Sequence, residues 1–320
     1  MYLKYTNDST GFCFFNSVAV AAKHAIKEGR AKKVAIIDYD IHHGNGTQEL
    51  IYDDPNILFI SLHRYSTKID DDFFPGTGDS KEIGAEQALG TNLNVAWKSM
   101  AMGNAEYAMA LSELVLPILS EFDPDLVIVS SGFDAAEGDP IGDCNLTPSM
   151  FHSITRCILE TVGVNTPVVV ALEGGYNIDV TSSCMEAVAL ALIDEDWSNE
   201  MSVPQDRTNA HHITTTETDK ENNRDVKNNG DEVKQTRLQK GRQALAQEWD
   251  HYNTKGLVKQ SAIRDVNRSI GAIRQYVSAD LPKISVQPKI SVQVIQNERV
   301  TTRSRSKAKS LEQALESLHL

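Results

Sequence analysis

The sequence has few cysteines, no long apolar run and no excess of positive charge. Its four cysteines lie far apart and form no Cys-x-x-Cys pair, which argues against a zinc ribbon and against a disulfide-linked secreted module. We therefore expect reduced thiols in the core. No run approaches the about 18 apolar residues that cross a bilayer, so no membrane association is expected. The formal net charge of −13 argues against direct binding to nucleic acid.

Short β-branched runs alternate with helical segments between residue 11 and about residue 195. Strands are predicted at 34–40, 57–63, 126–133 and 167–175, and helices at 15–29, 103–122, 147–163 and 179–194. We expect Pro117 to bend the second helix or to start a new turn, and Thr147 to be the N-cap of the third. The alternation is typical of a three-layer α/β/α fold with a mostly parallel sheet, in which ligands bind beyond the carboxyl ends of the strands.

Composition changes after residue 195, which predicts four regions. Residues 1–195 form the main domain, and the polar segment 196–231 is predicted to be a disordered linker. Residues 232–280 are predicted to be helical, with Ile263, Val266, Ile270 and Ile273 on an apolar stripe that packs on the main domain or binds a partner. Residues 281–320 form a low-complexity tail with a duplicated PKISVQ, a basic RSRSKAKS and a short terminal helix. The basic segment is a nuclear address, a tail that contacts phosphate or, as we favour, a solvated low-complexity stretch.

Two predicted strands lead into residues that can bind a metal. The first continues as IIDYDIHHG, where alternation places Asp38, Asp40 and His42 on one face. The third leads into Asp134, which would lie beside them if the two strands are neighbours. Asp40, His42 and Asp134 would then give zinc three N/O ligands and an open position for water, as a hydrolase needs. We do not assign His43 to the metal.

Two further segments carry groups that suit a substrate site. In LEGGYN, Gly174 and Gly175 let the backbone approach a ligand, and the Tyr176 hydroxyl can donate a hydrogen bond to a tetrahedral oxyanion. In DDDFFPGTGD, Phe73 and Phe74 lie on a loop framed by glycine and proline, where paired aromatic rings can form the wall of a channel.

Each motif taken alone also has a structural explanation. Asp-x-Asp-x-His after a strand is a common turn, Asp134 is a plausible helix N-cap, and Gly-Gly-Tyr is most often a turn. Phe73 and Phe74 are the types of residue found in cores and lids. The joint occurrence of acids and imidazole at successive strand ends favours the metal site.

Taken in order, the segments resemble one family. GFCFFNSVAVAAKHA, DYDIHHGNGTQ, ISLHRY, FFPGTGD, SSGFDAAEGDP and LEGGYN are similar to blocks of the zinc-dependent histone deacetylases, most of all the class II group, which have an arginase-like α/β fold. The resemblance implies that Asp40, His42 and Asp134 bind Zn²⁺ and that Tyr176 stabilises the transition state. It also implies that Phe12 and Phe74 form the walls of an acetyl-lysine tunnel.

The resemblance further implies a potassium site and a departure from the family pattern. The potassium ligands would be Asp38, Ser61 and the backbone carbonyls of Asp40, His42 and Leu62. Family members carry Gly-His-His shortly before GFCFFN, and Asp38 and Asn45 would orient those histidines. Counting back in this sequence gives Tyr2 and Leu3 instead. A general base contributes about 10²–10⁴ in rate, so a chain without the pair, and without the first part of the domain, is expected to be nearly inert by itself.

The implied reaction is zinc-dependent hydrolysis of the acetyl amide of N6-acetyl-lysine in histones or other proteins, with a role in chromatin and transcriptional repression. We expect acetylated tails to be attracted by the acidic Asp70, Asp71 and Asp72, a corepressor complex to bind the C-terminal helices, and the protein to lie in the nucleus or cytoplasm. Two alternatives remain, a catalytically inactive scaffold and an acetylpolyamine deacetylase. A binuclear manganese hydrolase is disfavoured because its additional Asp/His motif is absent.

Overall fold

A five-stranded parallel sheet forms the centre of the protein. The computed structural model describes residues 11–66, 73–194, 230–253 and 258–277. The strands are β1 (Val34–Asp38), β2 (Ile57–Arg64), β3 (Asn92–Trp97), β4 (Leu126–Ser131) and β5 (Val168–Leu172), in the spatial order β3-β2-β1-β4-β5. All neighbouring pairs are parallel. The predicted α/β class with a parallel sheet is therefore confirmed.

The strand order reverses beside β1, and this determines where a ligand can bind. The chain runs from β1 outward to β2 and β3, and it later returns to the other side of β1 to form β4 and β5. Loops leaving β1 and β4 therefore diverge and leave a crevice beyond their carboxyl ends. Asp38 pairs in register with Ser61 of β2 and Ser130 of β4, so residues after Asp38 and after Ser131 emerge side by side.

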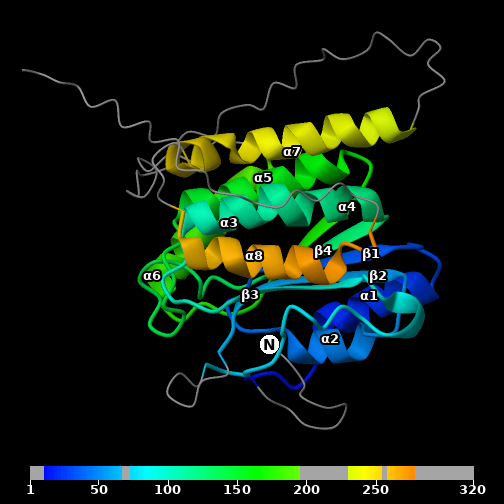
Figure 1. Cartoon of the computed structure of the whole chain (residues 1–320), viewed down its shortest axis with the longest axis horizontal. Helices are drawn as coiled ribbons and strands as arrows, with labels where there is room; N and C mark the ends of the chain where they lie inside the picture. The colour runs from blue at the N-terminus through cyan, green and yellow to red at the C-terminus, as the bar shows by residue number, and fades with distance from the viewer. Residues whose placement is uncertain (1–10, 67–72, 195–229, 254–257, 278–320) are drawn as a thin grey trace, which may run out of the picture. The chain divides into compact units, whose positions relative to one another are not determined.

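Helices cover both faces of the sheet, as Figure 1 shows. On one face lie α1 (Ser17–Lys27) and α2 (Asn45–Ile51). On the other lie α3 (Asn104–Ala110), α4 (Leu116–Phe122) and α5 (Pro148–Val162), while α6 (Ile178–Leu192) packs on α5. A short 3-10 turn, η1 (Glu86–Ala88), precedes β3. The three-layer arrangement is thus confirmed.

One strand and one α-helix were not predicted, and polar residues explain both omissions. In β3, Asn92 and Asn94 gave the segment the appearance of a loop, yet both side chains are buried. Their Nδ2 atoms each donate to the Gln48 Oε1 of α2 at 2.8 Å, whereas their Oδ1 atoms accept from no described residue. Internal amide hydrogen bonds thus replace part of the solvent contact. The helix α2 was missed because its seven residues begin with Asn45 and Gly46, both poor helix formers.

Pro117 changes the helical geometry as expected. Between α3 and α4 the backbone forms a π-helical turn, η2 (Leu111–Val115), and Pro117 lies in the first turn of α4. Proline has no N–H group to donate and clashes with the preceding turn of a regular helix, so a wider turn before it relieves both problems. Thr147 is at the N-cap position of α5, but its hydroxyl accepts from Asn104 Nδ2 at 2.8 Å instead of capping the helix.

The C-terminal helices belong to the same compact unit as the sheet. The helix α7 (Gly230–Asn253) packs along α5, and α8 (Gln260–Ile273) covers the edge strand β3. The predicted stripe of Ile263, Val266, Ile270 and Ile273 is buried in the main core, which favours packing on the domain over partner binding. The helix α7 begins at Gly230, although the linker is predicted to extend to residue 231.

Backbone contacts reinforce the docking of α8. The carboxylate of Asp265 accepts from Lys98 N at 2.9 Å, and the Ser269 hydroxyl donates to Asn94 O at 2.7 Å. The helix thus satisfies polar groups at the open edge of β3 while it buries its apolar face.

Several predictions lie outside the described residues. These are most of the linker, the duplicated and basic segments of the tail, its terminal helix, the acidic segment 70–72 and the position of Tyr2 and Leu3. Of the four cysteines, Cys144, Cys157 and Cys184 are buried free thiols, but Cys13 is only partly buried, so its expected core position is wrong. None of the described helices has the length and apolarity that crossing a membrane requires.

We predict that α8 contributes strongly to folding. Replacement Ile270→Ala removes a side chain that is 2% exposed and should lower the free energy of unfolding by about 2–5 kcal/mol. The matched control is Ile193→Ala, whose side chain is 65% exposed and whose loss should cost at most about 0.5 kcal/mol. Urea denaturation measures both, and equal small effects would contradict the packing of α8.

Candidate metal centre

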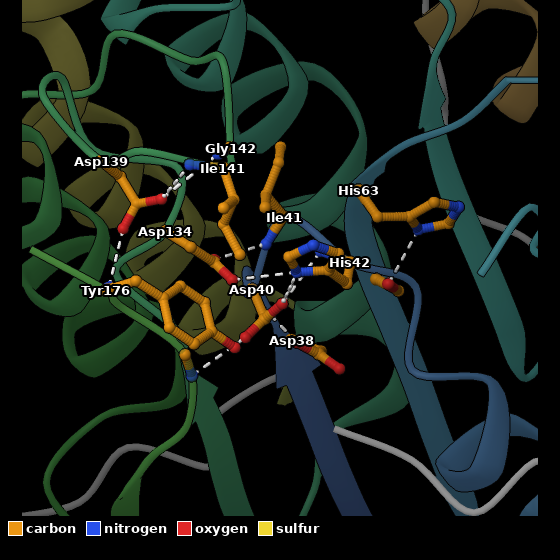
Figure 2. Close-up of polar contacts among 12 residues, drawn as sticks. Asp38, Asp40, Ile41, His42, His63, Asp134, Asp139, Ile141, Gly142 and Tyr176 are labelled. Atoms are coloured by element: carbon orange, nitrogen blue, oxygen red, sulfur yellow. Dashed lines mark hydrogen bonds and ion pairs between the residues drawn. The ribbon is translucent and has the colours of Figure 1, made fainter. Parts of the chain in front are cut away.

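Three side chains from the ends of β1 and β4 converge at the crevice. Asp40 and His42 follow β1, Asp134 follows β4, and one ligand atom from each lies within 4.8 Å of the others. His42 Nδ1 is 3.1 Å from Asp40 Oδ1 and 3.0 Å from Asp134 Oδ2 (Figure 2). The expected triad is therefore brought together, and its donor atoms are those that zinc takes in proteins.

Backbone groups hold the two carboxylates in place. Asp134 Oδ1 accepts from Ile41 N at 2.9 Å, and Asp40 Oδ2 accepts from Gly174 N at 3.1 Å. A Cβ atom on Gly174 would lie 2.4 Å from Asp134 Oδ2 and 2.6 Å from Asp40 Oδ2, and one on Gly132 would lie 2.3 Å from Asp40 Oδ2. These close approaches explain why glycine occupies both positions.

The charges of the triad favour a bound cation. Burial and the neighbouring Asp40 carboxylate raise the pKa of Asp134, whereas hydrogen bonds from His42 outweigh burial and lower the pKa of Asp40. Burial alone would lower the pKa of His42, but its bonds to Asp134 and Asp40 raise that pKa to about 9. Two buried carboxylates thus draw a positive charge toward the point they share, and a divalent ion would satisfy them more fully than a proton. The donor set fits zinc.

Aromatic rings surround the imidazole of His42. Phe73 stacks on it with ring centroids 4.9 Å apart and an interplanar angle of 7°, and Phe74 lies 6.4 Å away at a tilt. Phe73 is buried and Phe74 is partly exposed. The two residues therefore differ in role, because Phe73 packs against a predicted metal ligand while Phe74 is exposed beside it.

Tyr176 lies across the crevice with its ring directed toward Asp40 (Figure 2). Its backbone N donates to Asp139 Oδ2 at 2.8 Å, while Asp139 Oδ1 accepts from Ile141 N and Gly142 N. Burial and the carboxylates of Asp40 and Asp134 raise the pKa of the phenol, so its hydroxyl remains a hydrogen-bond donor. The ring of Phe12 meets that of Tyr176 edge to face at 6.1 Å.

Asp139 is a site residue that the sequence reasoning missed. It fixes the backbone of Tyr176 from the loop after β4, through a contact that bridges 37 residues of sequence. The only local signal was the Asp139-Pro140 pair, because Asp before Pro favours a turn.

The predicted potassium ligands lie deeper, on neighbouring strands. Asp38 and Ser61 are register partners of β1 and β2, Leu62 follows Ser61, and all three are buried. Asp38 Oδ1 accepts from Asp40 N at 3.1 Å, so Asp38 also supports the turn that presents the triad. Ser61 Oγ lies 2.9 Å from His63 Nδ1.

Two other imidazoles near the site are engaged elsewhere. His43 Nδ1 lies 2.8 Å from the Thr77 hydroxyl and its Nε2 lies 3.1 Å from Gln48 Oε1, while His63 Nε2 lies 2.9 Å from Gly78 O. Burial lowers the pKa of both, to about 4 for His63, which keeps them neutral. In the described part of the chain, the buried Asn45 Oδ1 has no hydrogen-bond partner.

A model of the histone deacetylase domain matches residues 5–192. This chain belongs to the histone deacetylase family. The match confirms the resemblance inferred from the motifs, and the observed parallel sheet agrees with it.

Individual histone deacetylases support the assignment. The chain is 43% identical to histone deacetylase HDA1 of Candida albicans over 201 residues. This alignment covers 62% of this chain and 24% of HDA1. It is 44% identical over 193 residues to histone deacetylase 15 of Arabidopsis thaliana, covering 60% of this chain and 34% of that protein. The solved structure of the histone deacetylase Clr3 superposes with a TM-score of 0.61 at 31% identity, over 94% of this chain and 41% of that one. The chain thus spans about a quarter to a third of these curated relatives.

We predict that the glycine at position 174 is required for metal binding. Gly174→Ala places a methyl group against both carboxylates and should weaken zinc binding by about 10–100-fold, the usual loss when the support of a ligand is removed. Competition with a chromogenic chelator measures the affinity. Gly271→Ala is the control, since a Cβ there meets nothing within 4 Å. Unchanged zinc affinity in Gly174→Ala would contradict the packing of the site.

Proposed function

We propose that this chain is a zinc-dependent hydrolase that removes the acetyl group from N6-acetyl-lysine in histones or other proteins, giving lysine and acetate. The convergence of Asp40, His42 and Asp134 at the crevice carries this proposal. Membership of the histone deacetylase family and the position of Tyr176 support it.

The residues around the triad have complementary tasks in this reaction. Zn²⁺ held by Asp40, His42 and Asp134 would polarise the acetyl carbonyl and lower the pKa of water at the site. Tyr176 remains protonated and can donate its hydrogen bond to the oxygen on which charge develops.

Apolar groups at the opening suit the aliphatic part of a lysine side chain. Phe12 and Phe74 are exposed aromatic residues beside Tyr176 and His42, respectively. Gly175 has φ +127°, and a Cβ there would lie 2.6 Å from Thr181 Oγ1. Only glycine adopts this backbone conformation without strain or a clash, so it determines where Tyr176 begins. A narrow apolar passage would admit the extended lysine chain and exclude branched groups.

The buried Asp38 and Ser61 suit a potassium ion, with the carbonyl of Leu62 as a further oxygen ligand. A monovalent cation there would offset the charge of Asp38 immediately behind the triad. Asp38 and Asn45 are also the residues assigned to orient catalytic imidazoles, and the buried Asn45 Oδ1 supports that role, since no described residue donates to it.

Histone tails and other acetylated proteins are the proposed partners, in the nucleus or cytoplasm. A corepressor complex, if it uses the C-terminal helices, would meet the outer face of α7, because the apolar stripe of α8 is already buried in the core.

We predict that Tyr176→Phe lowers kcat by about 10²–10³ and leaves zinc binding intact, because only the oxyanion donor is removed. Mass spectrometry of an acetylated histone H4 tail peptide measures turnover, and metal analysis measures zinc. Tyr276→Phe is a matched control, since Tyr276 is 40% exposed and Tyr176 39%.

The same assay separates the alternatives. Turnover that depends on Tyr176 would exclude an inactive scaffold, whereas zinc-loaded protein with no turnover would overturn the proposed reaction. Competition between the peptide and acetylspermidine distinguishes a protein deacetylase from a polyamine deacetylase, because preference for acetylspermidine would reassign the substrate.

We also predict slow turnover that added imidazole accelerates. By the resemblance to the family, Tyr2 and Leu3 take the positions of two histidines, and His43 and His63 bond to Gln48 and to the carbonyl of Gly78 and not to the triad. A missing general base costs about 10²–10⁴ in rate, so free imidazole should raise the rate with saturation, while equal ionic strength from NaCl should not. A rate equal to that of Clr3, with no response to imidazole, would contradict this expectation.

A further inference from the structure

Arg64 has a buried position that the proposed reaction does not explain. It ends β2, and its side chain is 7% exposed. Its Nη1 donates to Asp143 Oδ2 at 2.8 Å, and its guanidinium carbon lies 4.4 Å from the centroid of the Phe73 ring. Burying a guanidinium is unfavourable unless it has an ion-pair partner and a flat group to stack on. Asp143 is the ion-pair partner of Arg64, and the Phe73 ring is the flat group.

Phe73 packs against both Arg64 and the imidazole of His42. The Phe73 and His42 rings are nearly parallel, with centroids 4.9 Å apart. The guanidinium lies over the same Phe73 ring, with its carbon 4.4 Å from the centroid. Arg64, Phe73 and His42 therefore form a contiguous group of flat side chains joined through Phe73, which we call the arginine stack.

The arginine stack ends at the atom that would bind the metal. His42 Nδ1 lies 3.1 Å from Asp40 Oδ1 and 3.0 Å from Asp134 Oδ2. Rotation of the imidazole about its χ angles would carry Nδ1 away from that point. Phe73 restricts this rotation from one side, and Arg64 holds Phe73 against the imidazole.

Asp143 connects the same stack to the backbone of Asp134, the third predicted metal ligand. Its loop passes directly over Asp134, because a Cβ on Gly142 would lie 1.7 Å from Asp134 O. Asp143 O also accepts from Ala101 N at 2.6 Å, which anchors the loop to the segment before α3. The ion pair of Arg64 with Asp143 thus joins the β2 side of the crevice to the β4 side.

Other roles for Arg64 agree less well with its surroundings. A guanidinium that recognises an acidic substrate must be accessible, whereas Arg64 is buried, covered by Phe73 and paired with Asp143. A purely structural role would not require a flat group, because lysine could pair with Asp143 equally well as a point charge.

We propose that Arg64 is a positioning residue that acts through Phe73 to fix the orientation of His42 toward the metal. The inference rests on metal binding by the triad in the proposed function, but not on the substrate or on turnover. It adds to the site a residue that acts through the side chain of Phe73.

Co²⁺ binding to the full chain tests this role independently of activity. Co²⁺ replaces zinc in such sites, and its visible absorption band reports the geometry of the ligands. Arg64→Lys keeps the charge but loses the plane, so we expect Co²⁺ affinity to fall about 10–100-fold and the band to shift or weaken. The control is Arg156→Lys on α5, where Arg156 pairs with Glu160 at 2.8 Å and Asp194 at 2.7 Å. The control should leave both readouts unchanged.

A second variant guards against misfolding of the first. Phe73→Leu keeps an apolar side chain but removes the flat surface, and it should reproduce the loss of affinity and the spectral change. If the three groups act as one stack, the double variant should lose less than the product of the two single losses. Thermal unfolding of the metal-free proteins measures how much of each effect is structural.

The outcomes separate this inference from the proposed function. Unchanged Co²⁺ affinity and spectrum in both variants, with a lowered Tm, would reduce Arg64 to a structural residue and overturn the inference. Wild-type protein that binds metal but shows no deacetylation would overturn the proposed reaction alone. Wild-type protein that binds neither Zn²⁺ nor Co²⁺ would overturn both.

Discussion

Two buried carboxylates, those of Asp40 and Asp134, impose the constraint on which the rest of the site depends. Like charges in a low-dielectric interior repel each other unless a cation or hydrogen-bond donors compensate them. The fold supplies the backbone N–H groups of Ile41 and Gly174 and the imidazole of His42. These donors hold the carboxylates in place but leave a shared negative charge. A metal ion between them is the natural counter-charge, and the glycines at positions 132 and 174 leave room for the carboxylates to approach.

The parallel sheet explains why the two carboxylates meet at all. They are distant in sequence, yet β1 and β4 are neighbours because the chain builds the sheet outward on one side of β1 and then on the other. Loops that leave these strands diverge, which opens the crevice and lets β5 deliver Tyr176 to its rim. Helices on both faces make this arrangement rigid, and α8 closes the edge at β3 that would otherwise expose unpaired backbone groups.

Much of this arrangement could be predicted from local patterns. The strands β1, β2, β4 and β5 are runs rich in β-branched and other apolar residues, the pattern of parallel strands, although β5 lies at the edge and is partly exposed. The stripe on α8 has the helical period. Asp40, His42 and Asp134 were found because acids and imidazole stand directly after such runs. The strand β3 was missed because Asn92 and Asn94 look exposed in sequence, and only the amide network with Gln48 makes their burial favourable. Asp139 and Arg64 were missed because their partners are far away in the chain.

The sequence by itself determined the fold class, the residue types of the candidate metal site and the tyrosine beside them, because each follows from a period or a short motif. The tertiary structure decided which groups meet. It stacks the Phe73 ring on His42, places the Asp139 carboxylate where it accepts from Tyr176 N, and pairs Arg64 with Asp143. It also incorporated the C-terminal helices into the main core. The reason is physical, since ion pairs, ring stacking and burial depend on distances between segments that no local pattern encodes.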